Sequence, residues 1–121
     1  MTMKFNFDNE RPIYIQLVEQ LRIGILTSEF GVGEKIPSVR ELAMLAKVNP
    51  NTMQKALAEL EEEKLIYTER TNGKFVTKDV KLINNIRDNL AKEKAYDFFS
   101  NMKKIGMDEN KTIDYLRELI K

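Results

Sequence analysis

The sequence predicts a mainly α-helical fold with one small β-hairpin, in which short helices and the hairpin precede a two-helix tail. Three observations predict it. Apolar residues recur at helical spacing through most of the chain, two short helices are separated by a tight turn, and an Asn-Gly pair lies between two β-prone segments. We expect two parts: residues 1–78, which hold the first helices and the hairpin, and residues 79–121, which form the tail.

The composition is that of one compact domain with an appendage. The chain has 121 residues, of which 42% are hydrophobic and 32% are charged, and a disordered chain of this length would be poorer in apolar residues. It has no cysteine, so disulfides and thiolate metal sites are excluded. The net charge is only +1, so an argument for nucleic-acid binding must rest on where the charges lie.

The N-terminal stretch MTMKFNFDNE carries acidic residues where a secretory signal would have its apolar core. No later segment approaches the roughly 20 apolar residues that a membrane span needs. We therefore expect a cytoplasmic protein with no membrane partner.

The first helix is predicted to open at Pro12, whose missing N–H would be unpaired at that position. Apolar residues then repeat near helical spacing at Ile13, Leu17, Leu21 and Ile25. Glycine and proline interrupt residues 30–37, which we expect to be a connecting loop.

Ser38 and Glu41 form a capping-box pattern, which predicts that a second helix starts at Val39. We expect the apolar residues of this short helix to face a core: Leu42, Ala43, Leu45 and Ala46. Asn49 followed by Pro50 predicts the start of a third helix after a turn of three or four residues.

The third helix is predicted to have an apolar and a polar face. At about 100° per residue, one side carries Met53, Ala56, Leu57 and Leu60, and the other carries Asn51, Gln54, Lys55 and Ala58. Two helices joined by so short a turn, the second with amides and an amine outward, are typical of a helix-turn-helix whose second helix enters a DNA major groove.

Charge is polarised along this region. Four basic residues, Lys35, Arg40, Lys47 and Lys55, occur with one acidic residue, Glu41, and a run of glutamates follows at 59 and 61–63. We interpret the acidic run as a solvated face directed away from DNA.

The Asn72-Gly73 pair predicts a hairpin between segments 65–67 and 75–77, because both residues tolerate positive φ. A hairpin after a helix-turn-helix is a wing. Arg70 and Lys74 flank its tip, where they could meet phosphate or the minor groove.

The tail, 79–121, shows two amphipathic helices separated near Gly106, the second capped by Asp108. Such helices bury little surface alone. We therefore predict that their apolar residues form a dimer interface, with a ligand pocket as the less favoured alternative. The predicted dimerisation residues are Ile83, Ile86, Leu90, Phe98, Phe99, Met102, Ile113 and Leu116.

Four separated segments resemble the winged helix of the GntR family of bacterial transcription regulators: PIYIQLVEQLRIGIL, GEKIPSVRELA, VNPNTMQKALAELEEEKLI and GKFV. The short helical tail resembles the YtrA-type branch, whose members carry two dimerising helices in place of a large ligand-binding domain. The sequence departs from the family pattern at two positions where glycine is common. Lys64 stands at the end of the third helix, and Thr71 stands at the start of the wing.

The resemblance and the charge pattern together imply a set of DNA-binding residues: Lys35, Ser38, Arg40, Asn49, Asn51, Thr52, Gln54, Lys55, Arg70, Gly73 and Lys74. Asn49 has a capping role that would explain it without DNA. An ion pair with a neighbouring glutamate is the alternative for Arg40, and simple solvation is the alternative for Lys35 and Lys47.

We predict a sequence-specific DNA-binding transcription regulator, more specifically a homodimeric repressor that binds double-stranded DNA at an inverted-repeat operator. An enzyme is disfavoured because histidine, cysteine and a glycine-rich phosphate loop are all absent from the sequence. No cofactor or metal is expected, and an unidentified small-molecule effector would bind near the tail. The alternative is a winged-helix protein-interaction module, which would expose aromatic or aliphatic anchors on its third helix.

Overall fold

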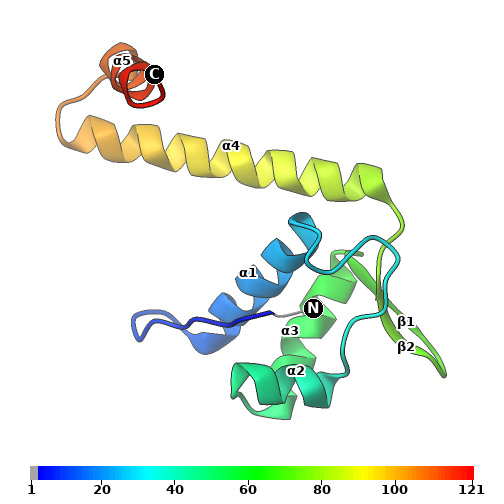
Figure 1. Ribbon diagram of the computed structural model, residues 1–121. Coiled ribbons are helices and arrows are strands. Elements are labelled where there is room, and N and C mark those ends of the chain that lie inside the picture. The colour runs from blue at the N-terminus through cyan, green and yellow to red at the C-terminus, as the bar shows by residue number, and fades with distance from the viewer. Residues whose placement is uncertain (1–2) are drawn as a thin grey trace. The chain divides into compact units, whose positions relative to one another are not determined.

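Figure 1 shows the computed structural model, which describes residues 3–121. Met1 and Thr2, the start of the N-terminal stretch considered above, lie outside these described residues. The elements in chain order are α1 (Ile13–Leu26), α2 (Val39–Ala46), α3 (Pro50–Glu62), β1 (Ile66–Glu69), β2 (Gly73–Val76), α4 (Val80–Lys104) and α5 (Glu109–Leu119). The predicted fold of helices with one hairpin is confirmed.

The chain forms two compact units, one ending at Asn84 and the other spanning Asn85–Lys121. The first unit therefore includes the opening turn of α4. Ile83 lies in this turn and is only 3% exposed, so its side chain belongs to the core of the first unit.

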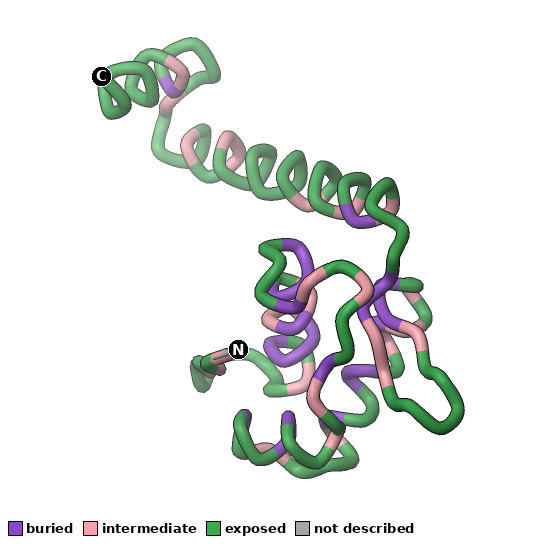
Figure 2. The backbone as a smooth tube through the Cα atoms, turned by 45° about the vertical axis from the view of Figure 1, so that its right-hand side comes forward, coloured by how far each residue is buried: buried purple, intermediate pink, exposed green. Residues whose placement is uncertain are grey.

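The core of the first unit lies where α1 and α2 pack on α3. Figure 2 shows the buried residues on the facing sides of these helices. The predicted helical repeat of α1 is confirmed, because its apolar side chains at every fourth position are almost fully buried: Leu17, Leu21 and Ile25. Ile13, at the first position, is 39% exposed.

The prediction that Leu45 faces the core is wrong, since its side chain is 54% exposed. The buried residues of α2 are Leu42, Ala43 and Ala46. On a helix, Leu45 lies about 60° from Leu42, about 100° from Ala46 and about 160° from Ala43. An eight-residue helix packed on one neighbour buries only a narrow stripe, and Leu45 falls outside it.

The hairpin pairs Ile66 with Val76 and Glu69 with Gly73. Its loop is therefore residues 70–72, and the expected two-residue Asn-Gly turn is not formed. Gly73 has a φ of +104°, whereas Asn72 is not among the positive-φ residues of 3–121. Asn72 instead closes the loop by donating from its backbone N–H to the Glu69 carbonyl oxygen at 3.2 Å.

The loop before α2 pairs with β2 through backbone hydrogen bonds, as a short additional strand would. Ile36 N–H donates to the Lys74 carbonyl at 2.9 Å, and Val76 N–H donates to the Glu34 carbonyl at 2.9 Å. An isolated bridge between Lys35 and Phe75 joins the same two segments. The hairpin is thereby fixed beside the start of α2, a contact that local sequence patterns did not predict.

The second unit holds the rest of α4 and α5. Gly106, in the short loop between α4 and α5, has a φ of +87°. Asp108 caps α5 as predicted, because its Oδ1 accepts from Lys111 N–H at 2.9 Å. The apolar side chains of this unit stay largely uncovered in the single chain: Phe98 is 42% and Ile105 is 70% exposed.

Candidate DNA-binding surface

The outward face of α3 carries polar and small side chains over its first two turns. Met53, Ala56 and Leu57 are fully buried. The residues predicted for the opposite face are all exposed: Asn51, Gln54, Lys55 and Ala58. The helical rotation read from the sequence is therefore confirmed. Thr52 lies at the edge of this face and is half-buried.

Side-chain caps fix the starts of both helices of the helix-turn-helix. Ser38 Oγ accepts from Glu41 N–H at 3.1 Å, and Glu41 Oε1 accepts from Ser38 N–H at 3.2 Å. Asn49 Oδ1 accepts from Asn51 N–H at 2.8 Å. The turn between them is tight because Lys47 takes a left-handed conformation with a φ of +57°. The predicted capping box and N-cap are confirmed.

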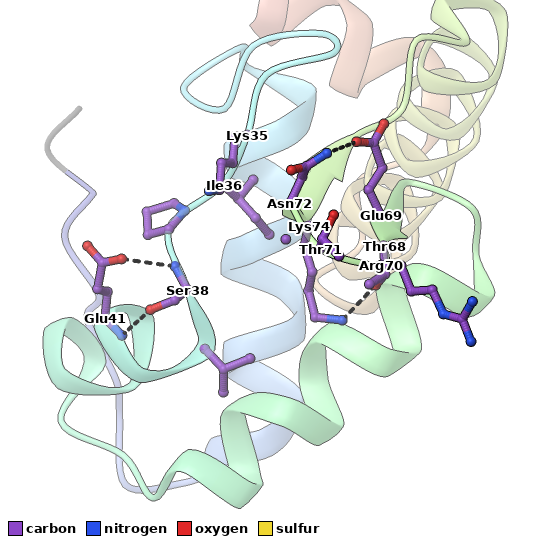
Figure 3. A pocket seen from close by; sticks show the side chains of 13 residues that line it. Lys35, Ile36, Ser38, Glu41, Thr68, Glu69, Arg70, Thr71, Asn72 and Lys74 are labelled. Atoms are coloured by element: carbon purple, nitrogen blue, oxygen red, sulfur yellow. Dashed lines mark hydrogen bonds between the residues drawn. The ribbon is translucent and has the colours of Figure 1, made fainter.

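An open groove of about 760 Å³ separates the start of α2 from the hairpin. Figure 3 shows its lining, to which the loop before α2 and the hairpin both contribute. Five of the sequence-predicted site residues line it: Lys35, Ser38, Arg70, Gly73 and Lys74. The fold thus brings together residues separated by more than thirty positions in the sequence.

Lys74 is directed toward α3, not toward solvent. Its Nζ donates to Glu61 Oε1 at 3.1 Å and to Thr68 Oγ1 at 2.9 Å, and its side chain is only 17% exposed. Partial burial raises the pKa of Glu61, but the hydrogen bonds from Thr68 and Lys74 outweigh it and lower that pKa below its usual value. Lys74 therefore ties the hairpin to α3.

The glutamates at 59 and 61–63 were expected to form a uniform solvated surface, and this expectation is wrong. Glu61 holds Lys74, and Glu63 accepts two hydrogen bonds from Arg22 of α1. Glu62 is the exposed member, and helical rotation places it close behind Asn51 and Ala58 on the outward face. A carboxylate there repels phosphate, so the DNA-compatible part of α3 ends before Glu62.

Gly73 is required by its surroundings. Its φ of +104° disfavours any side chain, and a Cβ at this position would lie 3.1 Å from Lys35 Cε. The Lys35 side chain therefore lies beside the loop end of the hairpin. Arg40 is exposed on the first turn of α2, and within residues 3–121 it forms no ion pair, so the alternative reading of a pair with Glu41 or Glu34 finds no support.

Lys64 shows why glycine is common at its position. It follows α3 with a φ of +67°, a left-handed conformation that is costly for residues other than glycine. This departure from the family pattern thus places a lysine in a conformation that favours glycine, at a conformational cost to this chain.

No group of three or more metal-ligating side chains occurs among residues 3–121. In that same part of the chain, each helix is too short or too polar to cross a bilayer.

A helix-turn-helix with a polar outward face on its second helix, followed by a wing, defines the class of winged-helix DNA-binding proteins. The model of the gntR family of bacterial regulatory proteins matches residues 13–76. The chain belongs to the GntR family and is a sequence-specific DNA-binding transcription regulator. The resemblance predicted from the four sequence segments is confirmed.

Individual relatives extend the match beyond the winged helix. YhcF, an HTH-type transcriptional regulator of Bacillus subtilis, is 31% identical over 115 residues, which are 95% of each chain. YtrA, an HTH-type transcriptional repressor of Bacillus subtilis, is 43% identical over 70 residues, covering 58% of this chain and 54% of YtrA. The structure of a GntR family transcriptional regulator from Listeria monocytogenes has a TM-score of 0.87 and 41% identity, covering 93% of this chain and 98% of that one.

Proposed function

We propose that this regulator is a homodimeric repressor that binds an inverted-repeat operator, with one α3 helix per subunit in successive major grooves. The observation that carries the proposal is the outward face of α3, where Asn51, Gln54 and Lys55 are exposed beside Ala58. The repressor role is taken from the similarity to YtrA. This function requires no catalytic step and no cofactor.

The chemistry of the outward face suits base reading. Asn and Gln amides pair bidentately with adenine in the major groove, and the small Ala58 allows close approach of the helix backbone. A protein-interaction module would present aromatic or aliphatic anchors here. The exposed face of α3 has none of these, which favours DNA as the partner.

The remaining predicted site residues divide by position. Lys35, Ser38 and Arg70 surround the groove beside α2, and Arg40 is exposed on the first turn of that helix. We assign these residues to phosphate or groove-edge contacts, because they flank α3 instead of lying on its outward face. Lys74 receives a positioning role, since Glu61 and Thr68 already occupy its ammonium group.

The proposed homodimer rests on apolar residues that the second unit leaves exposed or only half-buried. Ile83 is excluded from the predicted interface because it is already buried in the first unit. The interface residues that we retain are Ile86, Leu90, Phe98, Phe99, Met102, Ile113 and Leu116. A symmetric pair would set the half-sites about 34 Å apart, one helical turn, or a multiple of this. A small-molecule effector, where one acts, would bind within this interface.

Fluorescence anisotropy tests the DNA-binding proposal directly. The protein is titrated into a duplex from the region upstream of its own gene and into a scrambled duplex, at several salt concentrations. We expect tighter binding to the native duplex. The variant Gln54→Ala should weaken native binding by about 1–3 kcal/mol with little effect on the scrambled duplex. Equal loss on both duplexes would contradict base reading by Gln54.

Analytical ultracentrifugation tests the dimer. We expect the wild-type chain to sediment as a dimer and Phe98→Glu to shift it toward monomer, because a charge would be buried in the interface. Lys92→Glu is the matched control, since Lys92 is exposed on the same helix and outside the apolar set. A wild-type chain that stays monomeric on DNA would overturn the symmetric arrangement.

A further inference from the structure

Lys55 on the outward face of α3 is held by an aromatic ring from another helix. Its Nζ lies 4.7 Å from the centroid of the Tyr14 ring, at the start of α1. A separation below about 6 Å is within the range of an attractive cation–π interaction. Lys55 forms no ion pair within residues 3–121, so the ring is the group that restrains its ammonium.

Tyr14 also lies near an acidic residue of α3. Partial burial and the nearby carboxylate of Glu59, one turn after Lys55, raise the pKa of Tyr14. The ring is half-buried and lies where α1 packs on α3. Tyr14, Lys55 and Glu59 thus form one cluster that joins the two helices.

The stacking changes what Lys55 can do. A free lysine side chain has many rotamers, and it loses this freedom when it contacts a fixed acceptor. The ring covers one side of the ammonium group and leaves the other N–H donors available. It also draws the group away from the centre line of α3 toward α1, which flanks the recognition helix. Elements that flank a recognition helix meet the sugar–phosphate walls of the major groove, whereas its centre line meets the base edges.

We propose that Tyr14 is a positioning residue that holds Lys55 against a backbone phosphate of bound DNA. The inference rests on the proposed function. It adds the start of α1 to the DNA-binding machinery, although neither the charge pattern nor the polar face of α3 points to Tyr14. It also assigns Lys55 to phosphate, and leaves base reading to Asn51 and Gln54.

The test is a double-substitution cycle measured by anisotropy on the native upstream duplex and on the scrambled duplex. Tyr14→Leu should weaken binding to both duplexes by the same factor, about two- to fivefold, the range of an exposed cation–π contact. Tyr14→Phe keeps the ring and should bind within error of wild type. In a Lys55→Ala background, which lowers the salt slope by about 0.9, Tyr14→Leu should have no further effect. Ile15→Ala, an exposed neighbour on α1, serves as the control and should leave binding unchanged.

Three outcomes would overturn the proposal while the proposed function stands. Tyr14→Leu could bind DNA as tightly as wild type, it could weaken binding equally in the Lys55→Ala background, or it could weaken binding to the native duplex alone. A wild-type chain that binds neither duplex would overturn both. A DNA-free measurement guards against misfolding of the variant. The ε-methylene protons of Lys55 should show an upfield ring-current shift by NMR in wild type and in Tyr14→Phe. That shift should vanish in Tyr14→Leu while the shifts of core methyl groups persist.

Discussion

Arg22 of α1 and Glu63, the residue that caps the end of α3, form a two-pronged ion pair. Arg22 Nε donates to Glu63 Oε1 at 3.0 Å, and its Nη2 donates to Oε2 at 2.5 Å. The two side chains are only 23% and 27% exposed. This geometry makes the pair stronger than an ordinary surface contact, because both charges are partly withdrawn from water and both carboxylate oxygens are paired.

Arg22→Ala is therefore expected to lower the free energy of unfolding by about 1–2 kcal/mol, since it leaves Glu63 half-buried without its partner. Urea unfolding followed by circular dichroism measures the change. Arg11→Ala removes the pair between Arg11 and Glu19, whose side chains are 51% and 41% exposed, and should cost less than about 0.5 kcal/mol. Similar losses in the two variants would show that burial of the Arg22 pair adds nothing.

The contact of Glu61 with Lys74 and Thr68 predicts a pH dependence of stability. The folded state lowers the pKa of Glu61, so the stabilisation is present above the unfolded pKa of about 4.3 and is lost as pH falls through the folded value. The stability difference between wild type and Glu61→Gln, measured by urea unfolding, should be a few tenths of a kcal/mol near neutral pH and should shrink as the pH is lowered below the unfolded pKa. Glu29→Gln, at an exposed carboxylate, should show no such trend.

Replacing Lys64 with glycine should stabilise the protein. A φ of +67° strains a lysine but not a glycine, and relief of that strain exceeds the entropy lost from the greater freedom of an unfolded glycine. We expect a gain of about 0.5–1 kcal/mol in thermal or urea unfolding. Glu62→Gly, two residues earlier in the helical conformation, should destabilise by a similar amount. A loss in both variants would contradict the assignment of strain to Lys64.

Asn49 combines a cap with a proposed DNA contact, and two substitutions separate these roles. Asn49→Ala removes the acceptor for Asn51 N–H and should cost about 1 kcal/mol of stability. Asn49→Asp keeps an acceptor oxygen at the cap and should preserve stability. On the proposed DNA-facing surface, however, its negative charge should weaken binding to any duplex. Unchanged DNA binding by Asn49→Asp would restrict Asn49 to capping.

The sequence predicts local features of this fold well because their causes are local. The capping box of Ser38 and Glu41 and the N-cap at Asn49 each depend on residues within one helical turn, and both are present. The outward face of α3 follows from rotation alone. Two local predictions failed: the Asn72-Gly73 turn, which is replaced by a three-residue loop, and the burial of Leu45, because the sequence does not show how wide a stripe its helix will bury.

Contacts between distant segments were not predicted. The pairing of Lys74 with Glu61 and the stacking of Lys55 on Tyr14 join residues whose partners are set by how α1, α3 and the hairpin pack. A run of glutamates looks the same in sequence whether it is solvated or holds a lysine or an arginine. Ile83 likewise fits the repeat of the tail helix, but lies in the core of the other unit.

In the proposed complex, the exposed carboxylate of Glu62 would limit the length of DNA sequence that one α3 helix contacts. The outward face before it, from Asn51 to Ala58, is roughly 12 Å long, which matches three or four base pairs. A sequence of four base pairs recurs by chance about every 256 positions. That is far too often to specify one promoter among the million or more competing sites of a genome. Two such half-site sequences at a fixed spacing recur about once in 65,000 positions. In the proposed complex, pairing of the two subunits thus lowers the frequency of chance matches about 256-fold.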